Sequence, residues 1–160
     1  MPNQLQKYMN KISGPLMDRI DIQVEIEPVE FDDMANRAPA ESSAAIRARV
    51  MAAREIQQAR FKDLPGIHCN AQMSGKQLQK FAWPDPAGLK KLKDRMTKLN
   101  LSARAFDRIL RVARTIADLE SAANSIPLDQ AISAPVEARH IAEAIGYRAL
   151  DRPSNHGLAF

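Results

Sequence analysis

Four arginines with helical spacing are the residues of this chain best suited to bind an anion. They lie in the stretch LSARAFDRILRVARTIADLE and are Arg104, Arg108, Arg111 and Arg114. A guanidinium carries several N–H donors in a planar fork that matches a carboxylate or a phosphate. Arg104 is unusual because it lies in the first turn of a predicted helix, where the helix dipole favours an anion over a cation. The row predicts either a phosphate-binding face or a solvent-exposed face that keeps a surface helix soluble.

Residues that could bind a metal or act as a nucleophile are few and poorly placed. His68 and Cys69 are adjacent, so most backbones cannot turn both toward one ion, while His140 and His156 stand alone. Cys69 also has no evident base beyond its neighbour. We therefore expect no metal site and no cysteine nucleophile.

A phosphate-binding loop is also missing from the sequence. Ser74-Gly75-Lys76 resembles the end of such a loop, but the motif needs a glycine five residues before Gly75 and a hydroxyl residue after Lys76. Asn70 and Gln77 occupy those positions. We expect that this chain alone binds no ATP by that route and hydrolyses none.

The stretch that carries the four arginines has the pattern of an amphipathic helix. Its apolar stripe consists of Phe106, Ile109, Leu110, Ala113, Ile116 and Ala117. Ser102 is a good N-cap because its hydroxyl can accept a hydrogen bond from an amide of the first turn. Asp107 and Arg111, and likewise Arg114 and Asp118, are spaced for i,i+4 ion pairs.

Further helices are predicted along the chain, which favours a small helical bundle. They cover residues 41–61, 74–82, 85–99, 101–122 and 136–150, with a short helix in 1–13 and one turn at 129–132. In the helix over 41–61 we expect a buried side formed by Ile46, Val50, Ala53 and Phe61. Its arginines, Arg47, Arg49, Arg54 and Arg60, are expected to face solvent with their stems packed down.

One β-strand is predicted within residues 16–29. Ile20, Ile22, Val24 and Ile26 alternate with polar residues, which is typical of a strand with one buried face. A single strand cannot satisfy its own backbone groups. Its partners therefore lie outside this chain or in another molecule, or the segment is not a strand here.

Size and composition agree with one small, mainly helical unit. The chain has 160 residues, of which 45% are hydrophobic and 26% charged, with a net charge of +4. The charge permits a nucleic acid or nucleotide partner without requiring one. A single cysteine excludes an internal disulfide and favours a reducing compartment. With no membrane-spanning apolar run or signal peptide, a cytoplasmic protein without membrane contact is expected.

Three stretches resemble one protein family. ISGPLMDRID, LSARAFDRILRVARTIADLE with HIAEAIGYRALDR, and ESSAAIRARVMAAREIQQARF are similar to the C-terminal part of the magnesium-chelatase-like AAA+ ATPases of the ComM/YifB type. The resemblance covers most of the chain. It departs from the family at Ser125–Glu137, which looks like an insertion, and in the tail after Arg152.

The resemblance implies a longer protein with an upstream P-loop core and a helical lid. This chain would contain the last core strand and the lid, which accounts for the unpaired strand. The implied division is residues 1–30 for the end of the core, 31–40 for a linker, 41–152 for the lid and 153–160 for a flexible tail. Without the rest of the core, residues 1–30 would be poorly ordered or would pair with another copy. The full-length protein would use ATP and Mg²⁺, assemble as a hexameric ring and act on DNA as a branch-migration motor in natural transformation. This chain alone would bind neither cofactor.

The same resemblance implies roles for individual arginines. Arg19 lies in the DRID stretch, which resembles the finger-bearing segment of the related MCM helicases, and would stabilise charge on a neighbouring subunit's ATP as an arginine finger in trans. Arg104 would be the second arginine sensor of the lid. Arg108 and Arg111 would contact phosphate or the subunit interface. For each, the alternative is a solvent-exposed arginine.

Two other functions remain open at the level of sequence. The chain could be an autonomous basic helical module that binds nucleic acid through the arginines of the 41–61 and 101–120 helices. It could also be the lid of a true magnesium-chelatase subunit of tetrapyrrole synthesis.

Overall fold

The computed structural model describes residues 11–24, 26, 28, 29, 31, 39–99 and 101–148. Its elements are α2 (Gly14–Met17), α4 (Ser43–Phe61), the 3-10 helix η1 (Asn70–Gln72), α5 (Gly75–Phe81), α6 (Pro86–Leu99), α7 (Ala103–Ala123), α8 (Leu128–Ala131) and α9 (Ala138–Gly146). The described residues form no extended strand, only isolated parallel bridges of Gln23 with Arg148 and of Pro84 with Val136. The prediction of a mainly helical bundle is confirmed.

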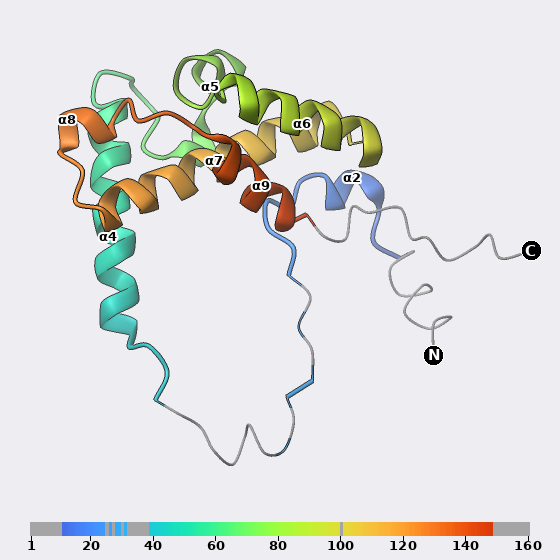
Figure 1. The fold of residues 1–160 in the computed structure, drawn as a ribbon, viewed down its shortest axis with the longest axis horizontal. Coiled ribbons are helices and arrows are strands. Elements are labelled where there is room, and N and C mark those ends of the chain that lie inside the picture. The colour runs from blue at the N-terminus through green and yellow to red at the C-terminus, as the bar shows by residue number, and fades with distance from the viewer. Residues whose placement is uncertain are drawn as a thin grey trace, which may run out of the picture.

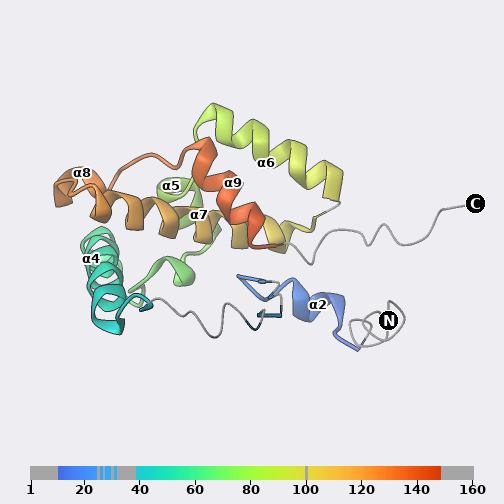
Figure 2. The same ribbon diagram turned by 60° about the horizontal axis from the view of Figure 1, so that its bottom comes forward.

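Helix α7 is the central element of the bundle. It contacts α4, α5, α8, α9 and η1, while α6 packs on α9. Figure 1 shows α7 crossing the molecule with α4 at its C-terminal end, and Figure 2 shows α9 lying between α6 and α7. The N-cap is as predicted, since the Ser102 hydroxyl accepts a hydrogen bond from the amide of Ala105 at 3.2 Å.

Small and aliphatic side chains on α7 form the centre of the core. Ala105, Ile109, Leu110, Ala113 and Ala117 are all buried. They meet residues from every neighbouring element, chiefly Phe61, Met73, Leu78, Leu92, Val136, Ile141 and Ala144. Alanines on the inner face let the surrounding helices approach α7 closely, which fits a sequence poor in aromatic residues.

Only the C-terminal half of α4 is buried. Ala53 and Phe61 lie in the core as predicted, but Ile46 and Val50 are 43% and 49% exposed, so their predicted burial is wrong. The helix continues beyond α7, and Figure 1 shows its N-terminal turns extending away from the other helices. The apolar stripe of α4 therefore runs farther than the surface that covers it.

Helix α6 approaches α9 across a glycine. Asp85 caps α6, because its Oδ1 accepts a hydrogen bond from the Gly88 amide at 2.6 Å. A Cβ added at Gly88 would lie 2.9 Å from Asp85 Oδ1, 3.0 Å from Pro84 Cβ and 3.3 Å from the amide of Ala138. Gly88 thus allows the first turns of α6 and α9 to meet.

The predicted strand within 16–29 is largely absent from the described residues. Its first part belongs to α2, and Gln23 is the residue that forms a bridge. The Gln23 amide donates to the Tyr147 carbonyl at 2.7 Å. A β-ladder needs several such hydrogen bonds to an extended partner strand, and the described residues that end α9 form only one bridge with Gln23. Ile22, Val24 and Ile26 are accordingly exposed. The predictions for residues 1–10, 32–38 and 149–160 lie outside the described residues.

Candidate functional site

Arg104 keeps the position that made it a candidate from the sequence. It lies in the first turn of α7 and its side chain is exposed. Within the described part of the chain it has no ion pair and no side-chain hydrogen bond. The first turn of a helix carries unpaired amides and a partial positive charge. An exposed guanidinium beside it makes this end of α7 attractive to an anion.

Arg108 and Arg111 already have partners within the chain. Arg108 Nη1 lies 2.8 Å from Asp21 Oδ1, which ties the segment after α2 to α7. Arg111 donates through Nη2 and Nε to the Met73 carbonyl at 2.7 and 3.2 Å, in the link between η1 and α5. The predicted Asp107–Arg111 ion pair is not among those formed by the described residues. Phosphate or interface roles for these two arginines remain predictions.

Arg19 lies in the turn that follows α2 and is exposed. Its Nη1 donates to the Pro15 carbonyl at 3.2 Å. The preceding residue, Asp18, accepts a hydrogen bond from the Ser102 hydroxyl at 3.0 Å. This contact holds the turn that contains Arg19 against the N-terminal end of α7. Ser102 precedes Arg104 by two residues.

A buried ionic cluster joins α4 to α7, and sequence reasoning missed most of it. Asp118 is fully buried and accepts hydrogen bonds from Arg60 at 2.5 and 2.8 Å. The predicted Arg114–Asp118 pair is confirmed, with Nη2 of Arg114 3.0 Å from Asp118 Oδ1. Arg60 was expected in solvent and Arg114 on a phosphate-binding or solvent-exposed face, but both are buried because they share this carboxylate. These arginines cannot contact an external phosphate in this arrangement.

Two arginines share one carboxylate in this cluster. Further N–H donors of these arginines therefore bind neutral acceptors, which are backbone carbonyls and the Asn70 side chain. Arg60 Nε donates to the Ile132 carbonyl at 2.8 Å, and Arg114 Nη1 donates to the Ala134 carbonyl. Asn70 donates to Asp118 at 2.8 Å and accepts from Arg60 at 3.1 Å. Burial lowers the pKa of Arg114, and the charge of Asp118 opposes that shift. The cluster also fixes the connection through α8, part of the stretch that looked like an insertion.

A signal for this cluster does exist in the sequence. Leu110, Arg114, Asp118 and Ser121 follow one another at helical spacing, directly beside the apolar stripe. Arg114, Asp118 and Ser121 need hydrogen-bond partners if neighbouring elements cover that face, because burying an unpaired polar group is costly. The partner Arg60 could not have been identified, because 58 residues separate it from Asp118.

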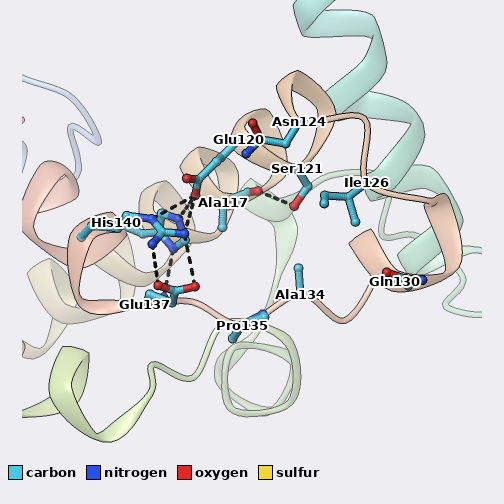
Figure 3. A pocket seen from close by; sticks show the side chains of 11 residues that line it. Ala117, Glu120, Ser121, Asn124, Ile126, Gln130, Ala134, Pro135, Glu137 and His140 are labelled. Carbon is cyan, nitrogen blue, oxygen red and sulfur yellow. Dashed lines mark hydrogen bonds and ion pairs between the residues drawn. The ribbon is translucent and has the colours of Figure 1, made fainter.

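A pocket of about 300 Å³ lies where the C-terminal part of α7 meets α8 and the start of α9. Figure 3 shows Glu120 and His140 directed toward each other at its edge. His140 Nδ1 accepts a hydrogen bond from the Glu137 amide at 2.9 Å, which assigns the proton of the neutral ring to Nε2, facing Glu120. The hydrogen bond from His140 lowers the pKa of Glu120. Nδ1 therefore caps α9 and Nε2 faces Glu120 of α7, so both ring nitrogens already have partners within the chain.

The described residues contain no group of three or more histidine, cysteine, aspartate or glutamate side chains placed to hold a metal ion. None of the helices formed by them combines the length and apolarity needed to cross a bilayer.

Two family models together match nearly all residues of this chain. Residues 40–148 match the family described as magnesium chelatase, subunit ChlI C-terminal, and residues 1–34 match magnesium chelatase, subunit ChlI. The chain therefore belongs to the magnesium-chelatase-like AAA+ family and corresponds to its C-terminal region.

The similarity to individual proteins places the chain in the ComM/YifB branch of this family. The chain is 39% identical over 154 residues to the uncharacterized protein YifB of Salmonella typhimurium, and 36% identical over 152 residues to the competence protein ComM of Haemophilus influenzae. It is also 36% identical over 153 residues to the uncharacterized protein YifB of Escherichia coli. Each match covers 94% of this chain and 27% of the relative, so the chain spans about a quarter of the length of these proteins.

Proposed function

We propose that this chain forms the ATP-sensing helical lid of a ring-forming AAA+ ATPase, with Arg104 as its sensor arginine. The observation that carries the proposal is the contrast along one row of α7. Arg108, Arg111 and Arg114 have partners inside the chain, whereas Arg104 has none among the described residues. A cation kept exposed at a helix N-terminus, against the helix dipole, is explained by an anion supplied from outside.

The residues at this end of α7 fit the phosphates of ATP. The Arg104 guanidinium could donate to terminal phosphate oxygens, and an exposed side chain can reach them without rearrangement of the core. The described residues offer no convergent carboxylates for Mg²⁺, so other parts of the ring would hold the ion. ATP and Mg²⁺ would supply the phosphoryl-transfer chemistry, and this chain would supply positive charge and position.

Arg19 is proposed as the arginine finger that acts on a neighbouring subunit. Its exposure and its place at the same end of α7 as Arg104 support the assignment. In this role its guanidinium would leave the Pro15 carbonyl and bind the transferring phosphoryl group. An arginine finger contributes roughly 10³–10⁵ in rate by stabilising charge in the transition state.

Action on DNA is proposed for the full-length protein. Its support is the relationship to the Haemophilus protein named competence protein ComM. The alternative of an autonomous module that binds nucleic acid through the arginines of α4 and α7 is weakened. Arg60 and Arg114 are buried, and Arg108 and Arg111 are occupied.

The direct test measures ATP binding and hydrolysis in the full-length protein. Arg19→Ala should lower kcat at least 10³-fold and Arg104→Ala roughly 10²-fold, in line with the loss of transition-state donors, while the Kd for ATP changes little. Arg54→Ala, an exposed arginine on α4, is the matched control and should keep wild-type turnover. Wild-type kcat in both site variants would refute the assignments.

Mixed rings test whether Arg19 acts in trans. Subunits with Arg19→Ala are combined with subunits whose P-loop lysine is replaced, so each parent ring is inactive. Activity should reappear in the mixture, because some interfaces join an intact P-loop to an intact Arg19. No recovery at any mixing ratio would contradict action across the interface. The chain described here should show no ATP turnover by itself.

A further inference from the structure

The outer face of α6 carries the densest positive charge in the described part of the molecule. Its 14 residues include five cations, Lys90, Lys91, Lys93, Arg95 and Lys98, and a single acid, Asp94. The helix alone thus has a net charge of +4, equal to that of the whole chain. All five cations are exposed.

These cations have no partners among the described residues. None of the five has an ion pair or a side-chain hydrogen bond there, even though Asp94 lies four residues from both Lys90 and Lys98. The helix dipole accounts for only one of them, Lys98 in the last turn. The bulk of the positive charge on α6 is therefore unexplained by the fold.

The cations lie on the exposed side of α6, with Lys91 and Arg95 on the flank that borders α9. Gly88 and Leu92 point inward, and α6 packs on α9. Figures 1 and 2 both show α6 at the periphery, with no described segment over its outer side. Lys91, Arg95 and Lys98 follow one another at i, i+4 and i+7 and form one row.

A recess lies beside this row, and two cations of the row, Lys91 and Arg95, help to line it. It has a volume of about 230 Å³ between α6 and α9 and is lined by Lys91, Arg95 and Arg148 together with apolar residues and Gly146. None of the described residues that line it is acidic.

We infer that the outer face of α6 binds the phosphate backbone of nucleic acid. From Lys90 to Lys98 the helix rises about 12 Å. One strand of B-DNA presents about three to four phosphates over that length. Protein interfaces are depleted in lysine and depend on buried aromatic or apolar anchors. The outer face of α6 offers lysines and no such anchor, which suits backbone binding without sequence readout.

This inference rests on the proposed DNA-acting function and locates a contact surface for it. It places the phosphate contacts on lysines of α6, whereas the sequence had suggested the arginines of α4 and α7. It also separates DNA binding from the nucleotide site, because no α6 residue is assigned to ATP.

The test compares two triple variants of this chain with equal loss of charge. Lys91→Gln/Arg95→Gln/Lys98→Gln removes the α6 row. Arg47→Gln/Arg54→Gln/Lys62→Gln removes three exposed cations of α4 and its C-cap that form no ion pair with any described residue. Binding to a fluorescein-labelled 30-base-pair duplex is followed by anisotropy between 50 and 200 mM NaCl. Circular dichroism and the emission of Trp83, which packs on Phe106, verify that each variant is folded.

Three phosphate contacts predict a slope of about −2.7 in log K against log salt, so wild-type affinity should fall about 40-fold over this range. The α6 variant should lose this salt dependence and at least tenfold in affinity at 50 mM. The α4 variant should stay within about threefold of wild type. Equal losses in both variants, or unchanged binding in the α6 variant, would overturn the inference. Displacement of DNA by polyglutamate at equal charge concentration would also overturn it and indicate an acidic protein partner.

The full-length protein separates failure of this inference from failure of the proposed function. There the α6 variant should lose DNA binding and keep basal ATP hydrolysis, whereas Arg104→Ala should do the reverse. If the full-length protein binds DNA tightly and the α6 substitutions leave this binding unchanged, only the placement of the DNA contacts on α6 is refuted. Absence of DNA binding by the wild-type ring would refute the proposed action on DNA and the α6 surface with it.

Discussion

Replacing Asp118 with asparagine should destabilise this chain more than any comparable surface change. The substitution keeps the shape of the side chain and removes the negative charge that Arg60 and Arg114 share. Contacts of 2.5 and 2.8 Å to Arg60 and 3.0 Å to Arg114 are weakened together. Removing one partner of a buried ion pair costs about 3–5 kcal/mol, because the remaining charge has no compensation. That is a large fraction of the roughly 5–15 kcal/mol that stabilises a typical domain.

Urea unfolding followed by circular dichroism measures this loss. With an m-value of about 2 kcal/mol/M, the midpoint should fall by roughly 1.5–2.5 M while m itself stays constant. Glu41→Gln is the matched control, because it breaks the Arg49–Glu41 pair, whose side chains are 58% and 44% exposed. Exposed pairs contribute about 0–1 kcal/mol, so this midpoint should move by less than about 0.5 M.

A third variant tests whether the carboxylate of Asp118 is the group that stabilises the cluster. Arg114→Met leaves the bidentate Arg60–Asp118 pair intact and removes the excess positive charge of the cluster. It should therefore cost less than Asp118→Asn. A midpoint for Asp118→Asn that matches the Glu41→Gln control, or a larger loss from Arg114→Met, would show that the shared carboxylate is not what stabilises the cluster.

Three further predictions concern the packing and capping of the helices. Gly88→Ala should cost about 1–3 kcal/mol in urea unfolding, since its Cβ would meet backbone and side-chain atoms, whereas Gly146→Ala, with open space around it, should be close to neutral. Ser102→Ala should cost about 1 kcal/mol through loss of the α7 N-cap, and a value near zero would contradict the capping role. Because His140 lowers the pKa of Glu120 below its usual 4.5, this contribution to stability is present above that pH and is lost as the pH falls through the lowered pKa. Thermal unfolding of wild type and Glu120→Gln should accordingly differ at pH 6 and converge toward pH 3, and a constant difference would contradict it.

Local patterns along the sequence predicted the helices well. Apolar periodicity and caps such as Ser102 depend on residues a few positions apart, so helices α6 and α7 begin where these signals indicated. Burial was harder to predict, because it depends on which elements meet. Ile46 has a core pattern yet is exposed, since α4 continues past its partner. Arg60 has a surface pattern yet is buried, because a carboxylate 58 residues away receives it.

The candidate site also has features that the sequence predicts and features that depend on contacts between distant residues. The position of Arg104 in a first turn was visible in the sequence, and the structure adds that its three neighbours in the row are occupied. The approach of the Arg19 turn to the same helix end could not be predicted. It depends on the hydrogen bond between Asp18 and Ser102, 84 residues apart. The lysines of α6 were visible in the sequence, but it could not be predicted that none of the described residues pairs with them.

The contacts that hold the segment after α2 in place also bear on the order in which the molecule folds and opens. The Arg148 guanidinium binds the Ile20 carbonyl across 128 residues of chain, and the Gln23 amide binds the Tyr147 carbonyl. Closing a loop of this length costs conformational entropy, and few apolar side chains of this segment are buried in return. The segment should dock last and detach first, by an opening that leaves the helices intact. The amide of Gln23 would then exchange with solvent well before the amides of α7, and each opening would release the turn that carries Arg19.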